Sequence, residues 1–199
     1  MNRTRHIRSG GERLAHWLLA VSVLILIPSG VEIYRAAPFY AIELRVLPGL
    51  GGSLTGALLW HFAAAWGLLS ALAMLGLRRL RGRGVVLWPL GLTSLRGNLR
   101  HALSHDDLGY NPVQKFAYLT VFALLGLVIL SGLAMWKPVQ FQTLTHLLGG
   151  YEAARRIHFC AMVGIGCFTV GHVVMALIVP RTILGMILGF KKDKHDGAA

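Results

Sequence analysis

Four histidines lie within long apolar stretches of the chain, where an ionisable side chain needs a specific role. These residues are His16, His61, His158 and His172. Ionisable groups are costly inside a membrane, and those that occur there usually serve a function. An imidazole in such a place can relay protons, or it can bind a metal through a neutral ring nitrogen. The four histidines therefore indicate either proton transfer or metal ligation.

The apolar stretches that carry the histidines are long enough to cross a membrane. Crossing about 30 Å of hydrocarbon takes about 20 helical residues, and four stretches qualify, at approximately 14–34, 54–77, 116–136 and 157–179. Of the 199 residues, 55% are hydrophobic and 14% are charged, which excludes an ordinary soluble domain. The short alternating segments of a membrane β-barrel are absent. We therefore expect one all-α domain over residues 1–199, an integral membrane four-helix bundle.

The positive charges are distributed unevenly along the chain. The formal net charge is +12, and most basic residues lie before the first span, in the loop between the second and third spans, or after the last span. The positive-inside rule then places both termini and this middle loop in the cytoplasm of a bacterium, with a multi-pass chain in the inner membrane. The basic composition is explained by this topology, so we expect no nucleic acid partner.

A further membrane-associated element is predicted at residues 93–103 of the middle loop. Leu95, Leu99 and Leu103 recur at helical spacing, with Arg96 and Arg100 between them. This pattern is typical of a helix that lies on anionic membrane lipids. A solvated loop with incidental leucines is the alternative.

The predicted topology places the histidines at two depths. His16 and His172 lie near the cytoplasmic ends of their spans, and His61 and His158 lie near the outer ends. His158 and His172 are fourteen residues apart, or roughly 21 Å along a helix. Two imidazoles at one level provide the axial ligands of a six-coordinate haem iron. We therefore predict two haems b, held by the pairs His16/His172 and His61/His158.

The other five histidines fall in predicted loops or termini, and we expect them to be solvated. They are His6, His101, His105, His146 and His195.

Several stretches around these residues are similar to one known family. They include RLAHW at His16, the Ser29-Gly30 pair, WHF at His61, YNPVQK at 110–115, LSGLAMWKP at 130–138, RIHF at His158 and GHVVMA at His172. Over most of its length the chain resembles the cytochrome b (gamma) subunits of membrane-bound formate dehydrogenases. It also resembles the related di-haem b cytochromes of periplasmic molybdopterin oxidoreductases and hydrogenases. The resemblance implies the same two histidine pairs.

The resemblance also implies a quinone pocket at the cytoplasmic end. It assigns part of this pocket to the segment that matches YNPVQK, in which Asn111, Gln114 and Lys115 could provide hydrogen-bond donors beside His172 and its haem.

These observations predict an electron-transfer subunit of a quinone-linked oxidoreductase complex. It would exchange electrons between a periplasmic partner, an iron–sulfur or molybdopterin subunit, and the quinone pool. One alternative is a free-standing b-type cytochrome that exchanges electrons between quinone and a small molecule. Another is a cofactor-free proton-coupled transporter, against which we note few helix interruptions and no inverted repeat. The pattern leaves open the substrate of the partner and the direction of electron flow.

Overall fold

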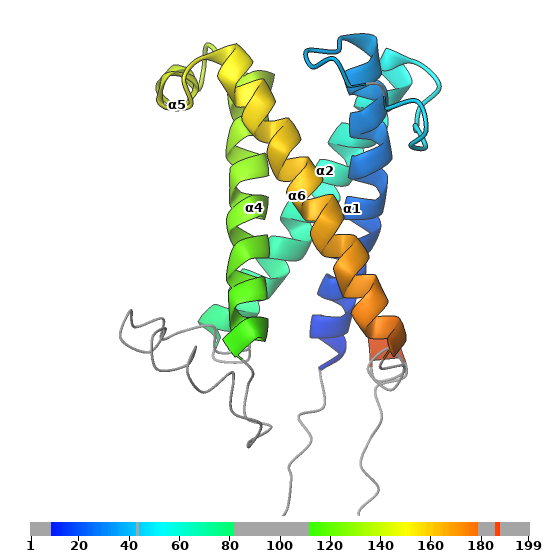
Figure 1. Cartoon of the computed structure of the whole chain (residues 1–199). Coiled ribbons are helices and arrows are strands. Elements are labelled where there is room, and N and C mark those ends of the chain that lie inside the picture. Colours follow the sequence, from blue (N-terminus) through cyan, green and yellow to red (C-terminus); the bar gives the residue numbers. More distant parts are fainter. Residues whose placement is uncertain (1–8, 43, 82–111, 179–185, 188–199) are drawn as a thin grey trace, which may run out of the picture. The chain divides into compact units, whose positions relative to one another are not determined.

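The computed structural model describes residues 9–42, 44–81, 112–178 and 186–187, and over these residues the regular structure is entirely helical (Figure 1). The helices are α1 (Gly10–Ala36), α2 (Leu54–Leu80), α4 (Pro112–Trp136), α5 (Gln142–Leu147) and α6 (Tyr151–Ile178). Four of them are long and apolar enough to cross a membrane. The all-α class and the four predicted spans are thus confirmed. The predicted interfacial helix at 93–103 lies outside the described residues.

The chain divides into two compact units. The first unit comprises residues 1–85 and 175–199, and the second comprises residues 86–174. Helices α1 and α2 belong to the first unit, and α4, α5 and most of α6 belong to the second. Whether these units associate into the single domain expected from the sequence is not tested, so that expectation stays a prediction.

In the first unit, α1 and α2 run side by side in opposite directions (Figure 1). Small residues line their contact: Ala57, Ala64 and Ala71 recur every seventh residue of α2, and all three are buried. Gly67 faces Ser22 so closely that a Cβ on the glycine would lie 2.6 Å from the serine Oγ. Small residues of this kind let membrane helices approach closely. The hairpin is therefore held by close backbone contact.

The loop between α1 and α2 is tied to the end of α1. Arg35 donates a hydrogen bond to the Leu44 carbonyl (2.7 Å) and pairs with Glu32 (3.0 Å). At the far end of the loop, the Leu50 N–H donates to the Pro28 carbonyl (3.2 Å). Gly51 and Gly52 then turn the chain with φ of 119° and 66°, a conformation that glycine adopts most readily. These contacts fix where α2 begins relative to α1.

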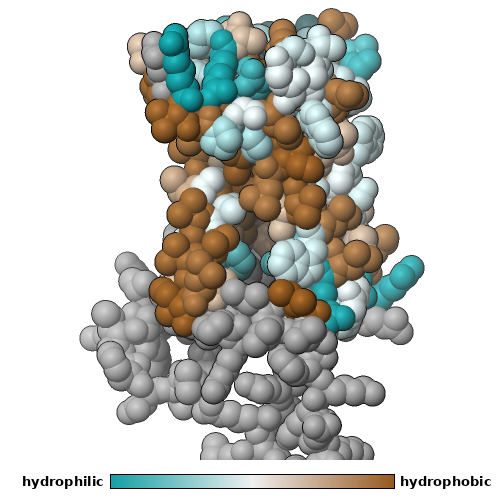
Figure 2. Space-filling view, turned by 90° about the vertical axis from the view of Figure 1, so that its right-hand side faces the viewer, coloured by the Kyte–Doolittle hydropathy of each residue, from teal (hydrophilic) through white to brown (hydrophobic). Residues whose placement is uncertain are grey.

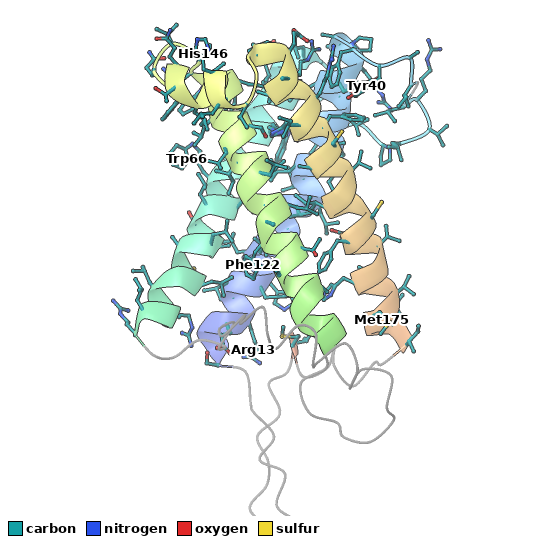
Figure 3. The ribbon with its side chains drawn as sticks, turned by 60° about the vertical axis from the view of Figure 1, so that its left-hand side comes forward. Arg13, Tyr40, Trp66, Phe122, His146 and Met175 are labelled. Atoms are coloured by element: carbon teal, nitrogen blue, oxygen red, sulfur yellow. The ribbon has the colours of Figure 1, made fainter. Side chains whose placement is uncertain are left out.

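In the second unit, α4 leads through the short helix α5 into α6. The Thr145 hydroxyl of α5 donates to the Ala134 carbonyl of α4 (3.2 Å), and Gly149 and Gly150, with φ of 85° and 93°, form the turn before α6. Helices α4 and α6 meet where a Cβ on Gly164 would lie 3.1 Å from Leu124. Helix α5 was not predicted, and it contains His146 (Figure 3), so the expectation that His146 lies in a loop was wrong.

The surface of the described helices suits a lipid environment. On the face in Figure 2, hydrophobic residues cover most of the middle, and the strongly hydrophilic residues gather toward the ends of the described part. On α2, Leu59 is 72% exposed and Trp66 is 63% exposed. Large apolar side chains exposed in this way lower the free energy only in contact with lipid or another apolar surface. The chain is therefore a multi-pass membrane protein.

Candidate functional site

His61 is held by a serine of the neighbouring helix. Its Nδ1 lies 3.0 Å from the Oγ of Ser29 on α1. The same Oγ lies 2.8 Å from the Ile25 carbonyl and 3.1 Å from the Leu26 carbonyl. A hydroxyl has one proton. Two oxygens only 2.8 Å apart repel each other unless a proton lies between them, so this proton is donated to the backbone. Ser29 therefore accepts a hydrogen bond from Nδ1–H of His61.

His158 is held in the same way in the second unit. Its Nδ1 lies 3.1 Å from the Oγ of Ser131 on α4, and this Oγ donates to the Leu127 carbonyl (2.6 Å). The Nδ1–Cε1 edge of the ring also lies against the bare backbone of Gly132, where a Cβ would lie 3.3 Å from the ring Cε1. Both rings are thus oriented by a buried serine, and protonation at Nδ1 places the lone pair of each ring on Nε2.

The two arrangements share their position in the fold as well as their contacts. His61 lies seven residues after Leu54, the first residue of α2, and His158 lies seven residues after Tyr151, the first residue of α6. Ser29 and Ser131 are each fully buried and each precede a glycine. No role for either serine was predicted from the sequence. The signal that could have revealed them is the Ser-Gly pair, which occurs in the second half of both helices.

His16 lies at the opposite end of the first unit from His61. It is three residues after Arg13, and Arg13 and Tyr40, labelled in Figure 3, mark the two ends of this unit. The His16 ring meets Trp17 edge to face, with ring centroids 5.4 Å apart. Trp17 Nε1 donates to the Met186 carbonyl (3.3 Å), and Arg13 donates to the Ile187 carbonyl (3.3 Å). Residues 186–187 therefore cover the beginning of α1 beside His16.

His172 lies near the end of α6, at the opposite end of this helix from His158. Its ring stacks on Phe168, one turn earlier, with centroids 6.0 Å apart and planes 9° apart. The His172 side chain is exposed, whereas His158 is half-buried. Each unit thus has one histidine near each end of its helices, as the depth argument predicted. The pairs His16/His172 and His61/His158 join residues of different units, and they stay predictions.

The ligand chemistry of these residues fits haem better than a bare metal ion. Among the described residues, no group of three or more His, Cys, Asp or Glu side chains could hold an ion. A structural zinc site needs about four such ligands, whereas haem carries four ring nitrogens of its own and needs one or two axial ligands from the protein. Separate histidines at the ends of the helices match that requirement.

The predicted quinone residues cannot be placed in the same way. Asn111 lies outside the described residues. Gln114 and Lys115 belong to the first turn of α4, which begins at Pro112, but their side chains are outside the described set.

Comparison with known proteins gives two matches. A family model described as "Prokaryotic cytochrome b561" matches residues 7–189. A protein of Azospira oryzae, named as a putative protein-methionine-sulfoxide reductase subunit YedZ1, is 46% identical over 187 residues, which cover 89% of this chain and 93% of the relative. No solved structure matches the chain significantly.

Proposed function

Because the chain belongs to the prokaryotic cytochrome b561 family, a family of haem-binding membrane proteins of electron transfer, we propose that it connects a periplasmic oxidoreductase with the quinone pool. The coarser part of the sequence prediction, a b-type cytochrome in the bacterial inner membrane, is confirmed. The number of haems, the partner and the quinone are parts of the proposal.

The observation that carries the proposal is the pair of histidines with defined ring tautomers. Ser29 and Ser131 accept hydrogen bonds from Nδ1–H of His61 and His158, so the lone pair of each ring is on Nε2. We propose that these two histidines hold one haem b near the outer face, and that His16 and His172 hold a second near the cytoplasmic face. Haem iron, when bound, supplies reversible one-electron exchange. Two such sites at different depths would span the membrane.

The proposed partner follows from the name of the Azospira oryzae relative. That relative is named as a putative subunit of a protein-methionine-sulfoxide reductase. Reducing a sulfoxide to a thioether consumes two electrons and two protons and releases water, and oxidising a quinol supplies two electrons and two protons. We therefore propose that electrons run outward, from quinol at the cytoplasmic side to a periplasmic reductase with a molybdopterin or iron–sulfur centre.

The resemblance to formate dehydrogenase cytochromes favours the opposite direction. A formate-oxidising partner would release electrons outside the membrane and pass them inward to quinone. The same ligands and the same two levels would serve either direction, since the direction depends on the potentials of partner and quinone. The identity of the proteins that co-purify with the chain separates the two candidates.

The quinone site is proposed at the cytoplasmic end, near the segment Asn111–Lys115 and His172. Hydrogen-bond donors at a quinone oxygen stabilise the negative charge that develops as the ring is reduced. Asn111 and Lys115 have suitable side chains, and the charge distribution of the chain assigns their loop to the cytoplasmic side.

The proposal is tested on the chain purified in detergent with any bound partner. We expect two haems b per chain, a low-spin bis-histidine spectrum, and reduction of both haems by a quinol analogue. A protein oxidised at methionine should then reoxidise the haems when the partner is present. One haem per chain would contradict the two-site arrangement, and reduction by formate but not by quinol would reverse the direction.

A further inference from the structure

We propose that Ser29 and Ser131 are positioning residues for His61 and His158, each within its own unit. Each serine would fix the tautomer of its histidine and would lower the reduction potential of the haem that this histidine binds. This inference rests on the proposed function, because it takes these histidines to be haem ligands. It gives the two serine hydroxyl groups a role that the assignment of the histidines as ligands does not explain.

The tautomer of each histidine follows from the two kinds of hydrogen bond that the serine hydroxyl makes, one to a backbone carbonyl and one to the ring. In both units the hydroxyl proton is directed to a carbonyl one turn earlier in the same helix, Ile25 or Leu127. The oxygen can then only accept from the ring. Nδ1 is therefore the protonated nitrogen, and the lone pair that a metal could bind is on Nε2.

The effect on potential follows from the same bonds. An acceptor at Nδ1–H pulls the proton away from the ring and makes the other nitrogen a stronger electron donor to the metal. A hydroxyl that already donates to a carbonyl is a better acceptor, because hydrogen bonds in a chain polarise each other. A stronger donor favours ferric over ferrous iron. Both serines are fully buried, so water cannot replace the bond when the hydroxyl is removed.

A purely structural role is the competing explanation for these serines. Serines in membrane helices often donate to the carbonyl four residues earlier, without any further function. Ser22 of α1 does so: its Oγ donates to the Leu18 carbonyl at 2.8 Å, and it is 2% exposed. Ser22 thus matches Ser29 in helix, burial and backbone bond, and differs in contacting Gly67 rather than a histidine. It is the matched control.

The test is a redox titration of the purified holoprotein, followed by absorbance, for Ser29→Ala, Ser131→Ala, the double variant and Ser22→Ala. We expect each single variant to raise the potential of the haem that its histidine binds. The ratio of reduced to oxidised haem at a fixed potential should rise about three- to tenfold, the size expected for losing one hydrogen bond to a metal ligand. Tenfold corresponds to about 59 mV for a one-electron couple.

With the proposed pair His61/His158, the double variant should show a shift near the sum of the single shifts, because the two serines act on separate ligands. Ser29→Thr keeps a hydroxyl that can make both bonds, and it should restore the original potential. Ser22→Ala should leave both haems at their original potentials.

The outcomes separate this inference from the proposed function. If Ser29→Ala and Ser131→Ala leave both potentials unchanged in a protein with two haems, the inference is overturned and the proposed function stands. If the two variants shift different haems, the proposed pair His61/His158 is wrong and the roles of the serines stand. If Ser22→Ala shifts the outer haem as much as Ser29→Ala, the effect is one of helix packing, and the assigned role is refuted.

Discussion

Gly132 lies against the Nδ1–Cε1 edge of the His158 ring. A Cβ at this position would be 3.6 Å from the His158 Nδ1, an ordinary contact, and 3.3 Å from its Cε1, which is closer than most Cβ atoms approach. The glycine is therefore favoured by the position of the imidazole rather than by the backbone conformation. The contact joins the last third of α4 to the beginning of α6.

Enlarging Gly132 should disturb the ligand geometry of His158. In Gly132→Ala the ring must move by a few tenths of an ångström, which should change the low-spin electron paramagnetic resonance signal of one haem while both remain bound. Gly132→Leu should displace the ring and lose that haem, because overpacking costs about 1–3 kcal/mol or more. Gly126→Ala is the control on the same helix, since a Cβ there meets nothing within 4 Å. Equal effects at both glycines would contradict the assigned contact.

Removing the histidines should define the two pairs. His61→Ala and His158→Ala should bleach the same spectral component, and His16→Ala and His172→Ala should bleach the other, because a low-spin iron needs both axial ligands. Absorbance spectra and the ratio of haem to protein measure this result. Two substitutions within one predicted pair that bleach different components would show that the pairing is wrong.

The contact between α1 and α2 should depend on Gly67. In Gly67→Ala the new Cβ would lie 2.6 Å from the Ser22 Oγ, so we expect a loss of about 1–3 kcal/mol in stability, measured as earlier loss of the Soret band on heating. Gly76→Ala on the same helix meets nothing within 4 Å and should be neutral or stabilising. The double variant Gly67→Ala with Ser22→Ala removes the clashing oxygen and should recover part of the loss. No recovery would mean that Gly67 has another role.

Quinone chemistry should depend on Asn111 and Lys115. Replacing either with alanine should slow haem reduction by a quinol analogue by about tenfold or more, because a donor to the developing charge is lost, while haem content stays unchanged. Stopped-flow absorbance measures the rate, with dithionite reduction as the control for intact haems. Unchanged rates in both variants would reject the site. That result would favour the alternative in which these polar residues only begin α4.

The sequence predicted the four spans well because length and apolar composition decide them. The predicted spans and the observed helices agree within a few residues, apart from α6, which begins six residues earlier at Tyr151. The levels of His16, His61, His158 and His172 followed from the same reasoning, because depth in a helix is proportional to residue number.

The serine contacts could not be derived from depth. Whether Ser29 reaches His61 depends on how α1 and α2 are rotated about their axes, and rotation is set by packing of small residues such as Gly67 against Ser22. The apolar pattern is weak evidence for rotation in a helix that is hydrophobic on all sides. Helix α5 was missed because six residues are too short for a clear periodic signal.

The bond from the Leu50 N–H to the Pro28 carbonyl has a consequence for how this protein can vary. It attaches the chain just before α2 to the residue next to Ser29, so the height of His61 is set by the few residues between Leu50 and Leu54. In the preceding part of the loop, the Val46 side chain is 95% exposed, so it can be replaced without moving the histidine. The carbonyls of its neighbours Arg45 and Leu47 accept hydrogen bonds from Arg35, so the length of this part is constrained. An insertion of one residue after Leu50 would rotate α2 and turn His61 away from its serine.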